Sequence, residues 1–197
     1  MKNVEDYMQW RTSEGKSFED IFNREMNILG WTYRDVLYSF LGIYVLGIYV
    51  YYEEDINKKK TRLEFKDGSQ LWNFEKIYKL YDKYEELNNL QEIKSFLSVY
   101  GSIGNIIPMW PGGNVHKGSC NYYDLTEIYF NNFKNWRDYL VLEYPNACLE
   151  EIVDRSEKYN MKEFMDKLDK EFYKKYLKDI TQVIKNREEE IKKQLHN

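Results

Sequence analysis

The chain has 197 residues, 43% of them hydrophobic, which is enough for one domain with its own core. Its formal net charge of −4 argues against the basic face that neutralises phosphates, so no nucleic acid is expected as a partner. Two cysteines do not make a disulfide framework, and the polar start MKNVEDYMQW is unlike a signal peptide. A cytoplasmic location is therefore expected.

Two helices are predicted near the start of the chain. Hydroxyl and carboxylate side chains occur there at the spacing of a capping box, with Asp in place of the usual Glu or Gln. The two pairs are Ser17 with Asp20 and Thr32 with Asp35. They predict one helix over residues 18–29 and a second from residue 33 to the mid-40s.

Residues 36–52 form an uncharged run that raises the question of a membrane span. A spanning helix needs about 20 predominantly apolar residues, and this shorter run contains five tyrosines and two glycines, so a buried core element is favoured and no membrane is expected. The pentad LGIYV occurs twice in it, which is too short a repeat for a solenoid. Aromatic and β-branched residues on both sides of a polar turn then predict a small β-hairpin near residues 48–66.

Helical periodicity dominates the rest of the chain. Helices are predicted from Ser69 onward, over residues 91–100, and after residue 123 with a break at Pro145. Together with the hairpin, these patterns predict a mainly α-helical fold and a single domain over residues 1–197.

The C-terminal helical segment 161–196 carries an apolar stripe on one face. Arg187 interrupts the stripe, and the last turns are densely charged. The sequence leaves open whether this segment projects, pairs with a second copy or wraps the domain.

The longest stretch without helical or strand periodicity is the Gly/Pro-rich loop 101–124. Loops longer than about 12–15 residues are uncommon in compact domains and are often functional. Its apolar side chains predict that it is ordered and packs, while its paired glycines permit positive φ and a nest of amides that could bind an anion. The candidate ligand-binding residues are Asn105, Trp110, Gly112, Gly113, Asn114, His116, Lys117 and Asp124.

A plainer interpretation exists for each of these residues, and a structural corner is the favoured role of the loop. Asn105 and Asn114 could satisfy loop backbone groups, and Trp110 could anchor the core. Asp124 could be the N-cap of the helix that follows it.

Common catalytic and metal signatures are missing from the sequence. The glycines match neither a dinucleotide fingerprint nor a P-loop, whose Gly-Lys-Ser order is not that of Lys117-Gly118-Ser119. Three arrangements can be written but lack diagnostic spacing: a triad of Ser119, His116 and Asp124, a zinc site of His116, Cys120, Cys148 and Asp124, and an acidic pair of Asp124 and Glu127. No metal or cofactor is predicted, and the sequence leaves open whether the protein is an enzyme.

The loop resembles that of an uncharacterised bacterial protein family. The shared pattern is Ser102-Ile103-Gly104-Asn105, Ile107-Pro108, Gly112-Gly113-Asn114, Lys117-Gly118 and Tyr123-Asp124-Leu125. The resemblance implies a shared fold core and loop, and it implies no reaction. The family's usual Arg-Gly is Lys117-Gly118 here, a change that would weaken bidentate recognition of an anion.

Two functions follow as expectations. The leading one is a cytoplasmic binding protein with a pocket for a small polar or anionic ligand, such as a nucleotide, at loop 101–124. The alternative is a protein-interaction module, such as a small bacterial or phage-encoded regulator or defence component. It would act through its aromatic surface or through segment 161–196. That segment would bind either a protein partner or a second copy of the chain.

Overall fold

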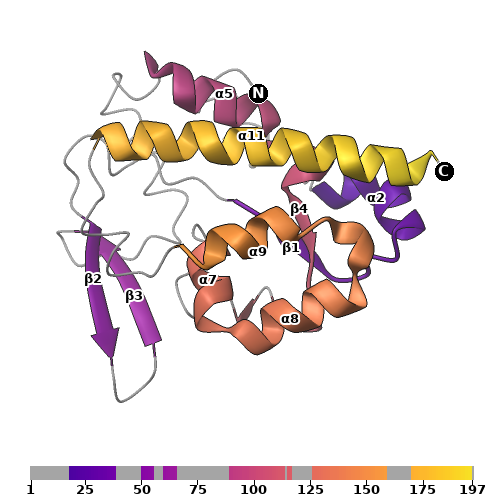
Figure 1. The fold of residues 1–197 in the computed structure, drawn as a ribbon, viewed down its shortest axis with the longest axis horizontal. Helices are drawn as coiled ribbons and strands as arrows, with labels where there is room; N and C mark the ends of the chain where they lie inside the picture. The colour runs from indigo at the N-terminus through magenta and orange to yellow at the C-terminus, as the bar shows by residue number, and fades with distance from the viewer. Residues whose placement is uncertain are drawn as a thin grey trace.

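The structure is a computed structural model that describes residues 18–38, 50–55, 60–65, 89–113, 115–116, 126–158 and 170–196. Within these ranges the protein is mainly helical, with two small antiparallel sheets (Figure 1), which confirms the predicted fold class. The elements in chain order are α2 (Phe18–Ile28), β1 (Arg34–Val36), β2 (Val50–Asp55), β3 (Lys60–Phe65), α5 (Gln91–Tyr100), η2 (Ile103–Asn105), β4 (Ile106–Pro108), α7 (Thr126–Asn132), α8 (Lys134–Glu143), η3 (Pro145–Ala147), α9 (Glu150–Ser156) and α11 (Lys170–Leu195).

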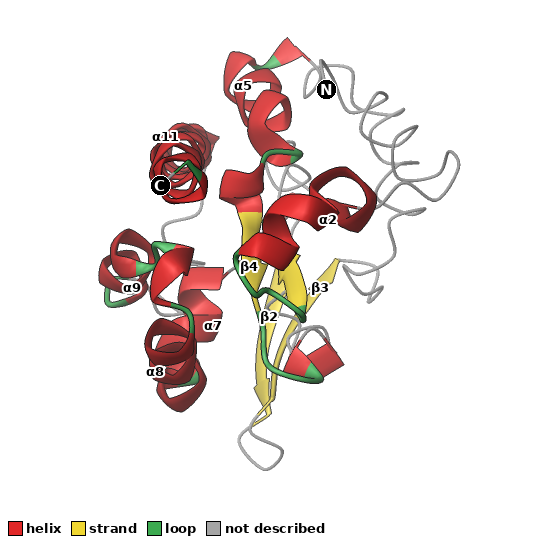
Figure 2. Ribbon diagram, turned by 90° about the vertical axis from the view of Figure 1, so that its right-hand side faces the viewer, coloured by secondary structure: helices red, strands yellow, loops and turns green. Residues whose placement is uncertain are grey.

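Helix α11 is the longest described helix, and other helices lie on two sides of it. Figures 1 and 2 show α5 on one side of it and the group α7, α8 and α9 on the other. Of the predicted apolar stripe, Tyr176, Ile180, Val183, Ile184 and Ile191 are buried, and Phe172 and Leu195 are partly buried against the core. Tyr173 and Leu177 are also buried on this helix. The described part of segment 161–196 therefore packs onto the domain, against α5 and η2.

The close approach of α11 to η2 depends on Gly104. A Cβ atom at this position would meet the backbone oxygen of Ile184 and would lie 2.9 Å from the backbone nitrogen of Glu188. A helix backbone cannot move aside as a side chain can, so only glycine fits here.

Strand β1 corrects the second helix predicted from residue 33. Arg34–Val36 pairs antiparallel with β4, with Val36 opposite Ile106 and Arg34 opposite Pro108. Thr32 and Asp35 therefore do not cap a helix. The remainder of that predicted helix, from residue 39 to the mid-40s, lies outside the described residues, as does the helix predicted from Ser69.

The other predicted elements are confirmed. α2 and α5 match the helices predicted over 18–29 and 91–100, and β2 pairs with β3 as the expected hairpin. Pro145 ends α8 and begins η3, where the missing N–H of proline is tolerated. No helix within the described ranges has both the length and the apolar character needed to cross a bilayer.

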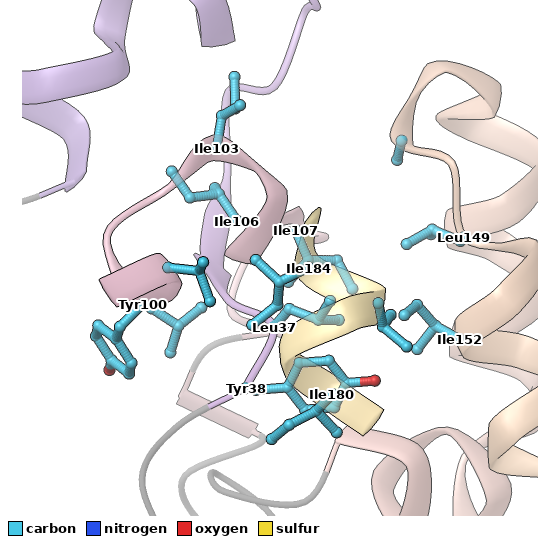
Figure 3. Close-up of a cluster of buried hydrophobic side chains, with 14 of the residues drawn as sticks. Leu37, Tyr38, Tyr100, Ile103, Ile106, Ile107, Leu149, Ile152, Ile180 and Ile184 are labelled. Carbon is cyan, nitrogen blue, oxygen red and sulfur yellow. The ribbon is translucent and has the colours of Figure 1, made fainter. Parts of the chain in front are cut away.

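One core joins α2, β1, α5, β4, α7, α8, α9 and α11. Figure 3 shows Leu37 and Tyr38 at the end of β1 beside Ile180 and Ile184 of α11, with Ile152 of α9 on the far side. The first half of the predicted loop belongs to this core, since Ile103, Ile106, Ile107, Met109 and Trp110 are all buried. This confirms that the described half of the loop is ordered and packs.

Candidate functional site

Asn105, the first predicted ligand residue, is fully buried and acts as an extension of the β1–β4 ladder. Its side-chain Oδ1 accepts a hydrogen bond from the Tyr38 amide at 2.9 Å, and its Nδ2 donates to the carbonyls of Tyr38 at 3.1 Å and Tyr100 at 2.9 Å. Its own carbonyl accepts from the Leu37 amide. All of these contacts are internal, and they satisfy backbone groups next to the core.

Trp110 and His116 belong to an aromatic cluster that joins the loop to α7 and α8. The Trp110 ring is buried and stacks on Trp136, with centroids 4.3 Å apart. His116 is half-buried, and its Nδ1 lies 2.9 Å from the hydroxyl of the buried Tyr129. Its ring also meets Phe133 edge-on at 4.9 Å.

The glycine pair turns the chain between these two aromatic residues. Gly112 has a φ of +81°, a left-handed conformation that favours glycine, and Gly113 lies directly on the Trp110 ring. The Gly113 amide donates to the Trp110 carbonyl, and the His116 amide donates to the Gly112 carbonyl. These two amides are thus used inside the turn.

Three predicted site residues, Asn114, Lys117 and Asp124, lie outside the described residues, as do Ser119 and Cys120 of the triad and zinc hypotheses. The anion pocket therefore stays a prediction. The structure brings Trp110, Gly112, Gly113 and His116 together, whereas Asn105 lies apart from them in the core.

A buried polar network, which the sequence did not predict, centres on Glu127 of α7. Its Oε1 accepts from the Tyr38 hydroxyl and from Arg155 Nε, both at 2.9 Å, and its Oε2 accepts from the Tyr176 hydroxyl at 3.0 Å. The neighbouring Thr126 hydroxyl donates to the Leu37 carbonyl. This network ties the residues that follow β1 to α7, α9 and α11.

Burial and the nearby Glu127 carboxylate raise the pKa of Tyr38 and of Tyr176 well above the ordinary value. Burial lowers the pKa of Arg155, but the charge of Glu127 and the hydrogen bond to it outweigh that effect and raise it. The tyrosines are therefore neutral donors and Arg155 is a cation. The two tyrosine hydroxyls, Arg155 Nε and both Glu127 oxygens find their partners inside the protein, so this network has the character of a structural device.

Tyr176→Phe should change how stability depends on alkaline pH. Unfolded tyrosine ionises near pH 10, whereas the folded Tyr176 pKa lies well above that, so the unfolded chain releases the proton first and stability falls as pH rises past about 10. Without this phenol, the decline should be shallower by up to about 1.4 kcal/mol per pH unit. Urea unfolding measured between pH 9 and 11 tests this, with exposed Tyr33→Phe as the matched control. Equal slopes in the wild type and Tyr176→Phe would contradict it.

An open groove is lined by residues of α8, η3 and α9. Figures 1 and 2 show α8 on the side of α9 away from α11. The groove has a volume of about 730 Å³. We call it the α8–α9 groove, and its lining residues are Asp138, Val141, Leu142, Pro145, Glu150, Val153 and Asp154. None of them belongs to the predicted loop site.

Helix α8 is unusual because Leu140 is its one buried residue. Among the described residues, seven large hydrophobic side chains are exposed, and four of them are on α8. Leu142 is 77% exposed and Val141 39% exposed, and both line the groove, while Trp136 and Tyr139 lie elsewhere on the helix surface. Leu140, Val141 and Leu142 are consecutive, so they point to different sides of the helix and a core on one side buries only some of them; the sequence does not show which.

Comparisons with protein-family models, with curated proteins and with solved structures found no match, so the family resemblance of loop 101–124 stays a prediction and the groove is interpreted from its own chemistry.

Proposed function

We propose that this chain is a protein-interaction module that binds a partner through the α8–α9 groove. The observation that carries the proposal is the exposure of Leu142 and Val141 on the wall of an open groove. Soluble chains seldom leave neighbouring large apolar side chains in water unless another surface covers them. Pro145 and Val153 extend the apolar lining.

Two further observations favour this function over a small anionic ligand at loop 101–124. Asn105 and His116, the polar side chains of the predicted loop site that the structure describes, both have internal partners. The groove itself is lined by carboxylates, which repel an anion, so a small anionic ligand is not expected in the groove either. The apolar stripe of segment 170–196 faces the core, so the proposed surface is α8 and not the C-terminal helix.

Leu142→Asp should abolish partner binding and leave the fold intact, because an exposed side chain contributes little to stability. The tagged chain is used to isolate partners from cells that express it naturally. Each partner is then purified and its affinity for the wild type and the variant is measured by titration calorimetry. A loss of affinity on the order of a hundredfold is expected for a central apolar contact.

Ile28→Asp is the matched control, since Ile28 is 63% exposed on α2, away from α8. It should bind like the wild type. The proposal fails if Leu142→Asp binds every purified partner as tightly as Ile28→Asp does, or if no partner binds the pure protein. Light scattering of the wild type shows whether the partner is a second copy.

A further inference from the structure

The two walls of the α8–α9 groove carry the same kind of pattern. On α8, Asp138 is followed by Val141 and Leu142 at helical spacings of three and four, so all three share one face. On α9, Glu150 is followed by Val153 and Asp154 at the same spacings. Each wall therefore offers apolar and acidic side chains together.

The exposed charge of the groove is negative. Within the part of the chain that the structure describes, Glu150 and Asp154 form no ion pair, and no lining residue is basic. Asp138 is held at 2.8 Å by Arg137, whose side chain is only 11% exposed and also bonds Glu157. Because Arg137 already pairs with Asp138 and Glu157, the positive charge that complements Glu150 and Asp154 has to come from a partner.

We infer that the α8–α9 groove binds a basic, amphipathic helical segment of its partner, an inference that rests on the proposed function. The apolar side chains of such a segment cover Val141, Leu142 and Val153. Its lysines or arginines then lie beside Glu150 and Asp154. A helix in a groove presents apolar anchors at the same three- and four-residue spacings, with charged residues flanking them. Acidic segments are rejected because like charges would face each other.

A synthetic peptide tests the chemistry of the groove even before any partner protein is identified. The probe is a fluorescent helix of about 18 residues made of leucine and lysine, with leucines at spacings of three and four. Fluorescence anisotropy with the full chain should show saturable binding that weakens as salt rises. A glutamate-for-lysine analogue and a scrambled peptide of the same composition should bind at least about tenfold more weakly.

Charge reversal locates the site. Glu150→Lys/Asp154→Lys should weaken binding of the basic peptide by at least about tenfold. The matched control Glu189→Lys/Glu190→Lys reverses two exposed charges on α11 and should bind like the wild type. The inference is overturned if the acidic analogue binds as well as the basic peptide, or if both charge variants bind alike.

The two proposals fail in different ways. If Leu142→Asp abolishes binding of the purified partner while Glu150→Lys/Asp154→Lys leaves it unchanged, the groove is the interface and the basic-segment inference is wrong. If Leu142→Asp leaves partner binding unchanged, the proposed function itself is wrong. Weak binding of the basic peptide that Leu142→Asp does not alter also overturns the inference, because the peptide then binds outside the groove.

Discussion

Arg187→Met is expected to lower the free energy of unfolding by about 3–5 kcal/mol, because several buried carbonyls lose their donor and each unsatisfied buried group costs about 1–3 kcal/mol. The Arg187 side chain is buried, and its guanidinium donates to the carbonyls of Gly104, Ile106, Ala147 and Cys148. Methionine fills similar space but donates nothing, so buried acceptors on η2, β4 and η3 lose their donor. Burial lowers the pKa of Arg187 to about 10, so it is still a cation at neutral pH.

Urea denaturation of the wild type and the variant measures this loss. Lys185→Met is the matched control, because it makes the same kind of change at an exposed position on the same helix and should shift the free energy of unfolding by no more than about 0.5 kcal/mol. Arg187→Lys should also destabilise, since one ammonium cannot reproduce the planar fork that reaches several carbonyls. If Arg187→Met proves as stable as Lys185→Met, the guanidinium does not hold these segments together.

The helices and the hairpin could be predicted because their signals are local. The capping pair Ser17 and Asp20 predicted α2, and helical periodicity predicted α5 and the buried face of α11. Aromatic and β-branched residues on both sides of a polar turn predicted β2 and β3. Strand β1 could not be predicted in this way, because three residues show no period and its partner β4 is about 70 residues away. Thr32 and Asp35 have the spacing of a capping box, which led to the wrong prediction of a helix there.

The polar sites depend on contacts that no local pattern contains. Glu127 accepts hydrogen bonds from Tyr38, Arg155 and Tyr176, which lie in three other segments and come together only in the tertiary fold. A weaker signal did exist. Arg187 interrupts an apolar stripe, and Glu127 lies within the apolar run before Phe130, which is where a buried charge with dedicated partners occurs.

The interaction surface was the hardest feature to foresee. The sequence favoured the loop, since long glycine-rich loops often carry function. In the described part of the loop, the Asn105 side chain instead bonds backbone groups, and Trp110 stacks on Trp136. The tertiary fold decides which apolar residues of α8 remain exposed, because it sets how many other elements pack against that helix. The residue pattern of one helix does not contain this information.

Glu127→Gln is the second substitution with a large expected effect, about 3–5 kcal/mol off the free energy of unfolding. Glutamine keeps the shape and can still accept from a tyrosine hydroxyl, but it removes the negative charge beside Arg155. The Arg155 side chain is only 12% exposed and that of Glu127 only 2%, so water cannot replace the lost partner well. The Arg155 guanidinium also lies 5.9 Å from the centre of the Tyr176 ring, which holds it in place after the change.

A double-mutant cycle separates the ion pair from simple loss of packing. If the cost comes from leaving one buried charge alone, Glu127→Gln combined with Arg155→Met should be less destabilising than the sum of the two single changes, by about 1–3 kcal/mol. The exposed pair Glu171 and Lys174 is the control, since Glu171→Gln there should cost no more than about 1 kcal/mol. Strict additivity at Glu127 and Arg155 would mean that each side chain stabilises the fold independently, through its own packing and hydrogen bonds. The network would then be a set of separate contacts around α7 and not one coupled device.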